Sequence, residues 1–224
     1  MKVLFVEARK RKDIDEKKAV GEFLGSNKIK RIGIAASVQY LGLAGDFKKE
    51  FEKNEVKVYS ARGSKTAYES QIIGCDTNAA LSVNNKVDAF VILSDGRFHA
   101  VQLALRTNKR VFVLQGESLG LIEQKEVEVI RKKRNAAVVN FLHSDKVGVI
   151  VSTKPGQQRL KEALKIKGRL EKNGKKAFLF IADTISIYEL ENFPCKSWVN
   201  TACSAMTLDS SRIVNTEEVE KFLG

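Results

Sequence analysis

Two similar stretches, RIGIAAS at residues 31–37 and KVGVIVS at residues 146–152, decide the fold. Each is a short, nearly continuous apolar run with a glycine at its third position (Gly33, Gly148) and a serine at its seventh (Ser37, Ser152). Runs of this length and kind are typical of strands that are covered on both faces of a parallel sheet. Because the pattern occurs twice, the sequence predicts an internal duplication.

Further apolar runs repeat the pattern and alternate with amphipathic helical segments. The strands that we expect cover residues 3–6, 31–36, 56–60, 89–93, 111–114, 147–152, 177–181 and 198–202. Two of the segments between them, residues 46–53 and 160–170, carry apolar side chains at helical spacing. Such alternation is typical of α/β folds with mostly parallel strands.

The predicted fold class is therefore α/β, with two related domains whose mainly parallel sheets are flanked by helices. The first domain is expected to cover residues 1–142 and to carry Cys75, and the second to cover residues 143–224 and to carry Cys203. The alternative is a chance similarity between two strand-turn-helix units.

The chain of 224 residues is basic, with 39 Lys and Arg against 27 Asp and Glu and a net charge of +12. The basic residues are spread over the whole chain, many beside acids, and no aromatic residues interleave with them to make a base-stacking surface. We therefore expect a solvated basic surface and no nucleic-acid partner, with a basic partner surface as the alternative. No apolar run approaches a membrane span and no leader is visible, so we expect a cytoplasmic chain without a membrane partner.

The three cysteines, Cys75, Cys195 and Cys203, form no CxxC pair, and their odd number argues against a disulfide framework. Cys75 comes just before an expected helix that Asp76 or Thr77 can cap, a position that favours the thiolate needed for metal ligation. For Cys75 and Cys203 alike, the alternative is a small buried apolar side chain.

Cys195 and Cys203 lie on either side of one expected strand. Eight residues of extended chain span up to ~26 Å. The two thiols are therefore expected at opposite ends of the strand, with Cys195 outside any site.

Four polar turns follow expected strands, at residues 37–40, 94–99, 152–157 and 203–206. The carboxyl ends of parallel strands meet at one edge of a sheet, where ligands bind. None of these turns is a Walker A loop or a Gly-x-Gly-x-x-Gly fingerprint. A zinc site built from Cys75, Cys203 and His99 is left open by this placement.

Together, four segments resemble one family: IGCD at residues 73–76, DGRFHA at 95–100 with LAL at 103–105, VSTKPGQ at 151–157, and VNTAC at 199–203. The chain resembles archaeal diphthamide synthase, the 2-(3-amino-3-carboxypropyl)histidine synthase, over nearly all its length. The resemblance implies the first step of diphthamide biosynthesis. In that step a [4Fe-4S] cluster and radical chemistry transfer a 3-amino-3-carboxypropyl group from S-adenosylmethionine to a histidine of translation elongation factor 2.

In that family three related α/β domains each supply one cysteine to the cluster, and the fourth iron binds S-adenosylmethionine. The resemblance therefore implies that Cys75 and Cys203 are cluster ligands. It also places S-adenosylmethionine at the polar turns, where the expected binding residues are Ser37, Gln39, Asp95, His99, Ser152, Lys154 and Gln157. We assign no catalytic residue from the sequence.

The resemblance covers only the second and third family domains, since the first expected strand begins almost at Met1. We therefore expect the third cluster ligand to come from a partner chain that supplies the first domain, from a homodimer partner, or from a side chain other than cysteine. The alternative function is a non-catalytic binding or accessory subunit of the same system. A third alternative is an unrelated α/β domain that binds a nucleotide or metabolite.

Overall fold

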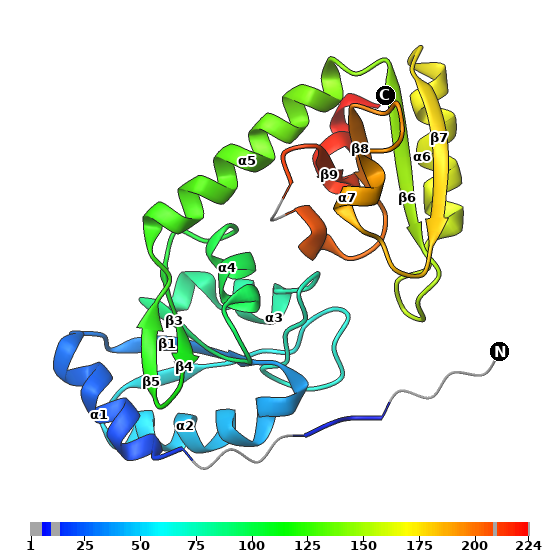
Figure 1. Cartoon of the computed structure of the whole chain (residues 1–224). Coiled ribbons are helices and arrows are strands. Elements are labelled where there is room, and N and C mark those ends of the chain that lie inside the picture. Colours follow the sequence, from blue (N-terminus) through cyan, green and yellow to red (C-terminus); the bar gives the residue numbers. More distant parts are fainter. Residues whose placement is uncertain (1–5, 10–13, 208–209, 224) are drawn as a thin grey trace. The chain divides into compact units, whose positions relative to one another are not determined.

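The structure is a computed structural model that describes residues 6–9, 14–207 and 210–223. The chain divides into two compact units, Met1–Val127 and Glu128–Gly224, and each unit is described by itself (Figure 1). The division lies within helix α5 (Gln124–Leu142). The domain boundary expected after residue 142 lies at the other end of this helix and stays a prediction. The strand expected at residues 3–6 lies, apart from Val6, outside the described residues.

The first unit contains a five-stranded sheet in the order β2-β1-β3-β4-β5. Its strands are β1 (Arg31–Ala36), β2 (Lys57–Tyr59), β3 (Ala89–Leu93), β4 (Arg110–Gln115) and β5 (Ser118–Leu121). The first four are parallel, and β5 turns back to run antiparallel to β4. In β3 every residue is buried, as expected for a strand covered on both faces.

Helices cover both faces of this sheet. They are α1 (Glu16–Ser26), α2 (Leu41–Lys53), α3 (Asn78–Leu81) and α4 (Phe98–Ala104), with 3-10 turns η1 (Val38–Tyr40) and η2 (Asn84–Lys86). In α2 the buried residues Ala44, Phe47 and Phe51 are spaced three and four apart, so one stripe faces the sheet. This stripe and Phe23 of α1 share a core with Phe112 of β4. α3 contacts β1, and α4 contacts β4.

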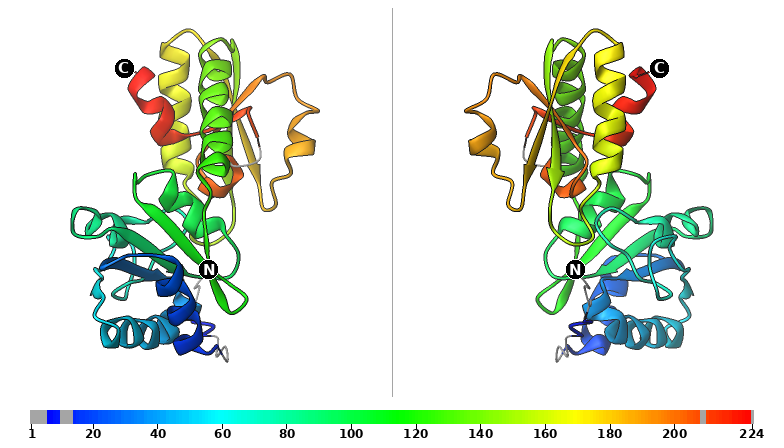
Figure 2. Two further views of the ribbon diagram at one scale, coloured as in Figure 1. Left: turned by 90° about the vertical axis from the view of Figure 1, so that its left-hand side faces the viewer. Right: turned by 90° about the vertical axis from the view of Figure 1, so that its right-hand side faces the viewer.

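The second unit has a four-stranded, all-parallel sheet in the order β7-β6-β8-β9. Its elements are β6 (Lys146–Ser152), α6 (Leu160–Lys172), β7 (Lys176–Ala182), α7 (Ile187–Leu190), β8 (Ser197–Asn200), η3 (Ser204–Thr207), β9 (Ile213–Asn215), α8 (Thr216–Val219) and η4 (Glu220–Phe222). The carboxyl-terminal part of α5 lies beside α6 on one face (Figure 2), where Phe141, Ile166 and Leu170 share one core. Phe180 and Trp198 pack edge to face with ring centroids 4.5 Å apart, in a smaller cluster of apolar side chains.

The first four strands of the five-stranded sheet have the same order as the four strands of the second sheet, as the predicted duplication requires. β1 and β6 occupy the same position, between β2 or β7 on one side and β3 or β8 on the other. Gly33 of β1 lies beside Phe90, and Gly148 of β6 lies beside Trp198, in each case as the register partner in the neighbouring strand. A Cβ at either glycine would overlap the aromatic ring. The repeated glycine therefore makes room for a large ring.

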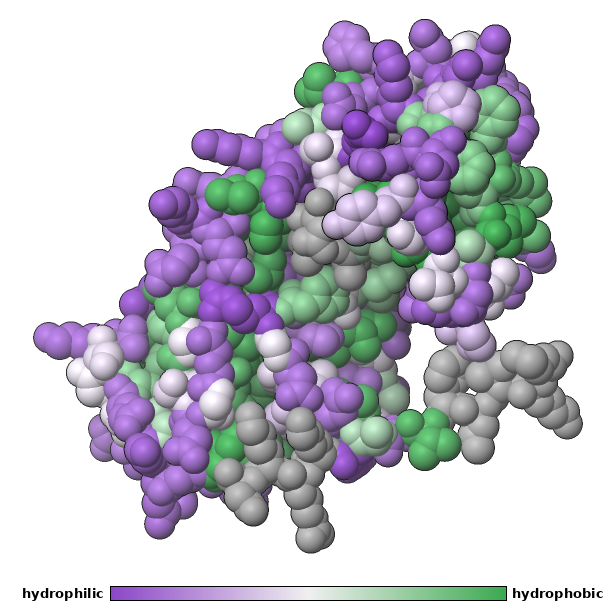
Figure 3. All heavy atoms as spheres, in the orientation of Figure 1, coloured by the Kyte–Doolittle hydropathy of each residue, from purple (hydrophilic) through white to green (hydrophobic). Residues whose placement is uncertain are grey.

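Hydrophilic side chains dominate the face of the molecule drawn in Figure 3. An apolar patch lies at the right of that view, over the second unit. Strand β7 of that unit carries two exposed apolar side chains, Phe178 and Ile181. Among the described residues no helix is long and apolar enough to cross a lipid bilayer.

Candidate functional site

At the carboxyl edge of the first sheet, the turn after β1 is tied to the end of β3. The two strands pair in parallel up to Ala36 and Leu93. Beyond that pair, the Ser37 N–H donates to the Leu93 carbonyl at 3.0 Å. The Ser37 hydroxyl donates to Gln39 Oε1 at 3.2 Å. Ser37 is buried and Gln39 is half-buried, so this turn presents its polar groups at the sheet edge.

A second contact across the same edge joins Tyr40 to Asp95. The Tyr40 hydroxyl donates to Asp95 Oδ1 at 2.5 Å. Tyr40 is 1% exposed, whereas Asp95 is exposed. Burial, together with the hydrogen bond and the charge of Asp95, raises the pKa of Tyr40 to about 12. The phenol is therefore neutral near pH 7 and acts as a donor to the carboxylate.

The loop that leads from Asp95 to His99 turns at Gly96, whose φ is +67°, a conformation that glycine adopts without strain. The half-buried His99 is the second residue of α4, and burial lowers its pKa below the ordinary value. Its Nδ1 atom is buried and has no hydrogen-bond partner among the described residues. Phe98, beside it, covers Gly74 so closely that a side chain at Gly74 would overlap its ring.

Cys75 lies at the tip of a tight turn in the first unit. The N–H groups of Ile73 and Asp76 donate reciprocally to each other's carbonyls, at 3.1 and 2.9 Å. Only Gly74 and Cys75 lie between them, and the Cys75 side chain is exposed. The thiol is thus presented to solvent by a turn whose glycine is covered by Phe98.

The buried carboxylate of Asp76 holds this turn against a second loop. Its oxygens accept hydrogen bonds from the Lys65 N–H at 2.7 Å, the Asn78 N–H at 2.9 Å and the Ser64 hydroxyl at 3.1 Å. Asp76 therefore binds the first N–H group of α3, as one of the two expected caps. Thr77 makes no capping bond with its side chain, and its hydroxyl accepts from Arg106 instead.

The helix after Cys75 is shorter than the sequence argument required. α3 has four residues, a single turn. One turn carries little of the macrodipole that would favour a thiolate at its amino end. The hydrogen-bonded turn, rather than the helix, is what positions Cys75.

In the second unit, the turn after β6 is closed by short hydrogen bonds. The Lys154 N–H donates to Ser152 Oγ at 3.1 Å, and the Gln157 N–H donates to the Lys154 carbonyl at 3.0 Å. Gly156 has a φ of +80°, which this turn needs. Ser152 is buried, Gln157 is half-buried and Lys154 is exposed.

Cys203 follows β8 at the same edge of the second sheet and is partly exposed. The buried side chain of Asn200 fixes its loop. Asn200 Nδ2 donates to the Cys203 carbonyl at 2.8 Å and to Asn215 Oδ1 at 2.9 Å, while Asn200 Oδ1 accepts from the Ala202 N–H at 2.9 Å. The hydroxyl of Thr201 donates to the Ile150 carbonyl at 2.7 Å.

Cys195 precedes β8, whereas Cys203 follows it, so the two thiols lie at opposite ends of this strand as expected. Cys195 is 6% exposed and belongs to the apolar cluster around Trp198. Burial raises the pKa of its thiol. Cys195 is therefore a buried side chain rather than an accessible ligand.

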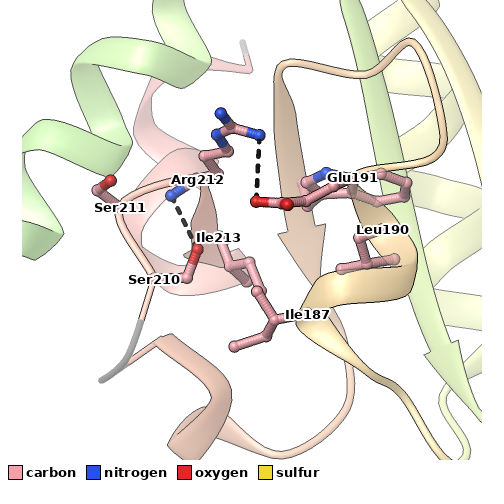
Figure 4. Close-up of a pocket in the computed structure, with 8 residues that line it drawn as sticks. Ile187, Leu190, Glu191, Ser210, Ser211, Arg212 and Ile213 are labelled. Atoms are coloured by element: carbon pink, nitrogen blue, oxygen red, sulfur yellow. Dashed lines mark hydrogen bonds and ion pairs between the residues drawn. The ribbon is translucent and has the colours of Figure 1, made fainter.

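The second unit also has a small pocket of about 200 Å³ that contains none of the predicted site residues. Its lining includes Ile187, Trp198 and Ile213, and Figure 4 shows Arg212 and Glu191 facing each other across it. Their side chains form an ion pair with a distance of 3.7 Å. The lining also includes the hydroxyls of Ser210 and Ser211 but no cysteine, so this pocket lacks the thiol expected of the cluster site.

The structure thus places the predicted residues in two sets. Ser37, Gln39, Asp95, His99 and Cys75 belong to the first unit, and Ser152, Lys154, Gln157 and Cys203 belong to the second. Within the described ranges, no group of three or more His, Cys, Asp and Glu side chains is arranged to hold a metal ion. That the two sets share one cleft stays a prediction.

Sequence reasoning missed the residues that hold the turns. Tyr40 and Asn200 were not expected to have a role of their own, although both lie inside the segments that were singled out. Asp76 was expected only as a helix cap. The available signal was a polar or phenolic side chain next to each turn, which by itself does not specify a partner.

Fold and site define a duplicated α/β protein that presents polar turns and one accessible cysteine after the strands of each unit. The whole chain, residues 1–224, matches the model of the family described as "Putative diphthamide synthesis protein". The chain therefore belongs to this family of diphthamide synthesis proteins.

Relatives and solved structures agree with this assignment. The chain is 29% identical to 2-(3-amino-3-carboxypropyl)histidine synthase of Pyrococcus horikoshii, covering 99% of this chain and 65% of the relative. It is 27% identical to the Methanocaldococcus jannaschii protein of the same name, covering 62% of that protein. The chain thus spans less than two-thirds of the length of these relatives.

Two crystal structures of Dph2 from Pyrococcus horikoshii share the fold. The first matches with a TM-score of 0.80 and 28% identity, covering 95% of this chain and 63% of Dph2. The second, with a 4Fe-4S cluster, matches with a TM-score of 0.81. These matches confirm the predicted α/β class with two mainly parallel sheets.

Proposed function

We propose that this chain acts in the first step of diphthamide biosynthesis. In this proposal it belongs to an enzyme that transfers a 3-amino-3-carboxypropyl group from S-adenosylmethionine to a histidine of translation elongation factor 2. The observation that carries the proposal is the family match over all 224 residues, joined to an accessible thiol on a hydrogen-bonded turn in each unit. Cytoplasmic localisation is part of the proposal, because the acceptor takes part in translation.

Cys75 and Cys203 are the residues that would hold the iron–sulfur cluster. Cysteine sulfurs are the usual ligands of such clusters, and both thiols are accessible. Both also lie on loops fixed by buried polar side chains, Asp76 and Asn200. The donor set of this chain therefore fits a cluster in part, with two thiols and a third to be supplied from outside these 224 residues.

When bound, the cluster would supply one-electron reduction that cleaves a carbon–sulfur bond of S-adenosylmethionine. The contribution of this chain is to bind and orient that substrate. The turns with Ser37 and Gln39 in the first unit, and with Ser152 and Gln157 in the second, offer hydroxyl, amide and backbone N–H groups for its carboxylate and ribose. Lys154 is exposed and adds a positive charge beside them.

The test uses the chain, reconstituted anaerobically with iron and sulfide, together with the part of the Pyrococcus horikoshii relative that this chain does not cover. Iron content and the mass of the modified histidine are measured. Cys75→Ser and Cys203→Ser should each lose iron and product, while the matched control Cys195→Ser should keep both. Product from the Cys75→Ser, Cys203→Ser double variant would contradict the assignment of ligands.

A second candidate function is a non-catalytic binding or accessory subunit of the same system. The observation that favours it is the coverage of 65% and 62% of the relatives, together with only two accessible cysteines. In that case the double cysteine variant would support product formation by the catalytic chain as well as the unaltered chain does. Loss of product with the double variant rejects the accessory role.

A further inference from the structure

The contact between Tyr40 and Asp95 is the best-defined interaction at the carboxyl edge of the first sheet. Both residues come just after strands that are neighbours in the sheet, β1 and β3, although they are 55 residues apart in the sequence. The ring of Tyr40 belongs to the main apolar core of the unit, so its position is fixed by packing. Its hydroxyl reaches out of that core to Asp95 Oδ1 at 2.5 Å.

We propose that Tyr40 is a positioning residue that holds the Asp95 carboxylate in place to bind a positively charged group of the ligand. This inference rests on the proposed function, because S-adenosylmethionine carries two such groups, the sulfonium and the α-ammonium. Both are cations that an anionic oxygen can contact directly. The two sources share this chemistry, and the experiment below separates them.

Placement supports a binding role for Asp95 over a purely structural one. Asp95 is exposed, at the edge where ligands of parallel α/β folds bind. A carboxylate whose only role is to accept the hydrogen bond of a buried phenol would be expected to be buried beside that phenol. Here the phenol is buried and the carboxylate faces out, so the hydrogen bond fixes a charge that remains accessible.

The Tyr40 hydroxyl is suited to hold the Asp95 carboxylate because it keeps its own proton and so remains a hydrogen-bond donor. The pKa of Tyr40 is raised to about 12, so the phenol stays neutral and donates over the whole physiological range. The loop beyond Asp95 turns at once, at Gly96 with its positive φ, and no helix holds Asp95 itself. The hydrogen bond from the Tyr40 phenol therefore restrains the carboxylate before the ligand binds, which lowers the ordering cost of binding.

The experiment compares binding of three compounds by equilibrium dialysis to the unaltered chain and its variants. Each is first reconstituted anaerobically with iron, sulfide and the part of the Pyrococcus horikoshii relative that this chain does not cover. S-Adenosylmethionine has both cations, S-adenosylhomocysteine keeps only the ammonium, and 5′-methylthioadenosine has neither. Asp95→Asn should weaken S-adenosylmethionine binding by about tenfold or more, the loss typical of a hydrogen bond to a charged group. Tyr40→Phe keeps the core ring and should weaken it by about three- to fivefold.

Neither variant should change the affinity for 5′-methylthioadenosine by more than about twofold. The decisive readout is the ratio of the affinity for S-adenosylmethionine to the affinity for 5′-methylthioadenosine, because a merely structural role of Tyr40 would weaken the binding of both compounds alike. The control Asp46→Asn removes an exposed carboxylate from α2 and should leave every affinity unchanged. If Asp95→Asn also weakens S-adenosylhomocysteine, the cation is the ammonium; if it does not, the cation is the sulfonium.

Unchanged S-adenosylmethionine binding by Asp95→Asn would overturn the inference and leave the proposed function standing. Equal losses for S-adenosylmethionine and 5′-methylthioadenosine would overturn it as well. If the reconstituted complex with the unaltered chain binds none of the three compounds, the S-adenosylmethionine site of the proposed function fails, and this inference fails with it.

Discussion

Three buried polar side chains, Tyr40, Asp76 and Asn200, hold the turns of the candidate site, each with less than 4% of its surface exposed. A buried polar group loses its water, and hydrogen bonds inside the protein must replace that loss. Asp76 and Asn200 replace it with several bonds to the loops of Cys75 and Cys203. Removing one such side chain therefore leaves several backbone groups unsatisfied at the same time.

Asp76→Asn is expected to lower the free energy of unfolding by roughly 1–3 kcal/mol, because an amide offers one oxygen where the carboxylate offers two. Burial alone would raise the pKa of Asp76, but hydrogen bonds from Asn78, Lys65 and Ser64 outweigh it, and the pKa lies below the ordinary value. A carboxylate whose pKa is lower in the folded state stabilises the folded protein at pH values above its unfolded pKa of about 4. This contribution is lost as the pH falls through the folded pKa.

Urea unfolding of the chain and the variant at pH 7 and near pH 3 measures this effect. The stability difference should be full at pH 7 and smaller near pH 3. The control Asp46→Asn, on the exposed side of α2, should cost less than about 0.5 kcal/mol. A difference for Asp76→Asn that is the same at both pH values would contradict the assignment to a charged Asp76.

The raised pKa of Tyr40 predicts how the stability of the chain changes at alkaline pH. Its folded pKa of about 12 lies above the ordinary value of 10, so ionisation is easier in the unfolded chain. The stability that it contributes is full below pH 10 and is lost as the pH rises towards 12. Tyr40→Phe cannot ionise and should escape this loss. The measurement is urea unfolding between pH 9 and 11.5, in which stability should fall more steeply for the unaltered chain than for Tyr40→Phe. Parallel curves would show that Tyr40 is not held neutral by the fold.

At the scale of secondary-structure elements, the repeated glycine sets how closely two strands and an aromatic ring pack. Gly33→Ala and Gly148→Ala would each drive a methyl group into the ring of Phe90 or Trp198. Each should lower the free energy of unfolding by about 1–3 kcal/mol, as overpacking does. Gly42→Ala, on α2 with open space around it, is the matched control and should be neutral or stabilising by up to about 1 kcal/mol.

Urea unfolding of these three variants, with the double variant Gly33→Ala, Phe90→Leu, provides the measurement. The smaller side chain at residue 90 should recover part of the loss caused by Gly33→Ala. If the double variant is less stable than the sum of the two single losses, the clash with Phe90 is not the cause. Equal stability of Gly33→Ala and Gly42→Ala would also reject the packing argument.

The sequence was sufficient for those elements whose whole length carries one pattern. The strands expected at residues 31–36 and 89–93 coincide with β1 and β3. β5 and β9 were missed because they are short edge strands of four and three residues, held by pairing with one neighbour. Their own residues do not show an apolar run long enough to be recognised.

The candidate site, too, could be predicted from the sequence only where a local pattern or the parallel topology is sufficient. The polar turns could be placed at the sheet edge because parallel topology alone puts them there. The bond between Tyr40 and Asp95 joins residues that are far apart in the sequence and depends on which strands are neighbours. The sequence argument did not predict the length of α3, although the Ser82, Val83 and Asn84 that follow it are weak helix formers.

At the scale of the whole molecule, the number of cysteine ligands decides whether this chain alone can hold the proposed cluster. The relatives are longer than this chain, and in the proposed function a further domain would supply the third cysteine. The 224 residues contain three cysteines, of which Cys195 is buried in an apolar cluster before β8. If this chain holds the cluster as proposed, its two accessible thiols would leave one iron without a protein ligand, and a solvent ligand in that place would make the cluster labile.

The last prediction follows from this count. The 224-residue chain alone should retain little iron after anaerobic reconstitution and show little cleavage of S-adenosylmethionine. Adding a polypeptide that carries the remaining family domain with its cysteine should raise both iron retention and transfer to the target histidine of elongation factor 2. The control is the same polypeptide with that cysteine changed to serine, which tests the thiol rather than the added protein surface. If the control restores iron and product equally, the added chain acts by contact alone. Full iron retention and full product from the 224 residues alone would mean that a third ligand lies within them, and His99, with its buried Nδ1 that has no hydrogen-bond partner among the described residues, is the first residue to change.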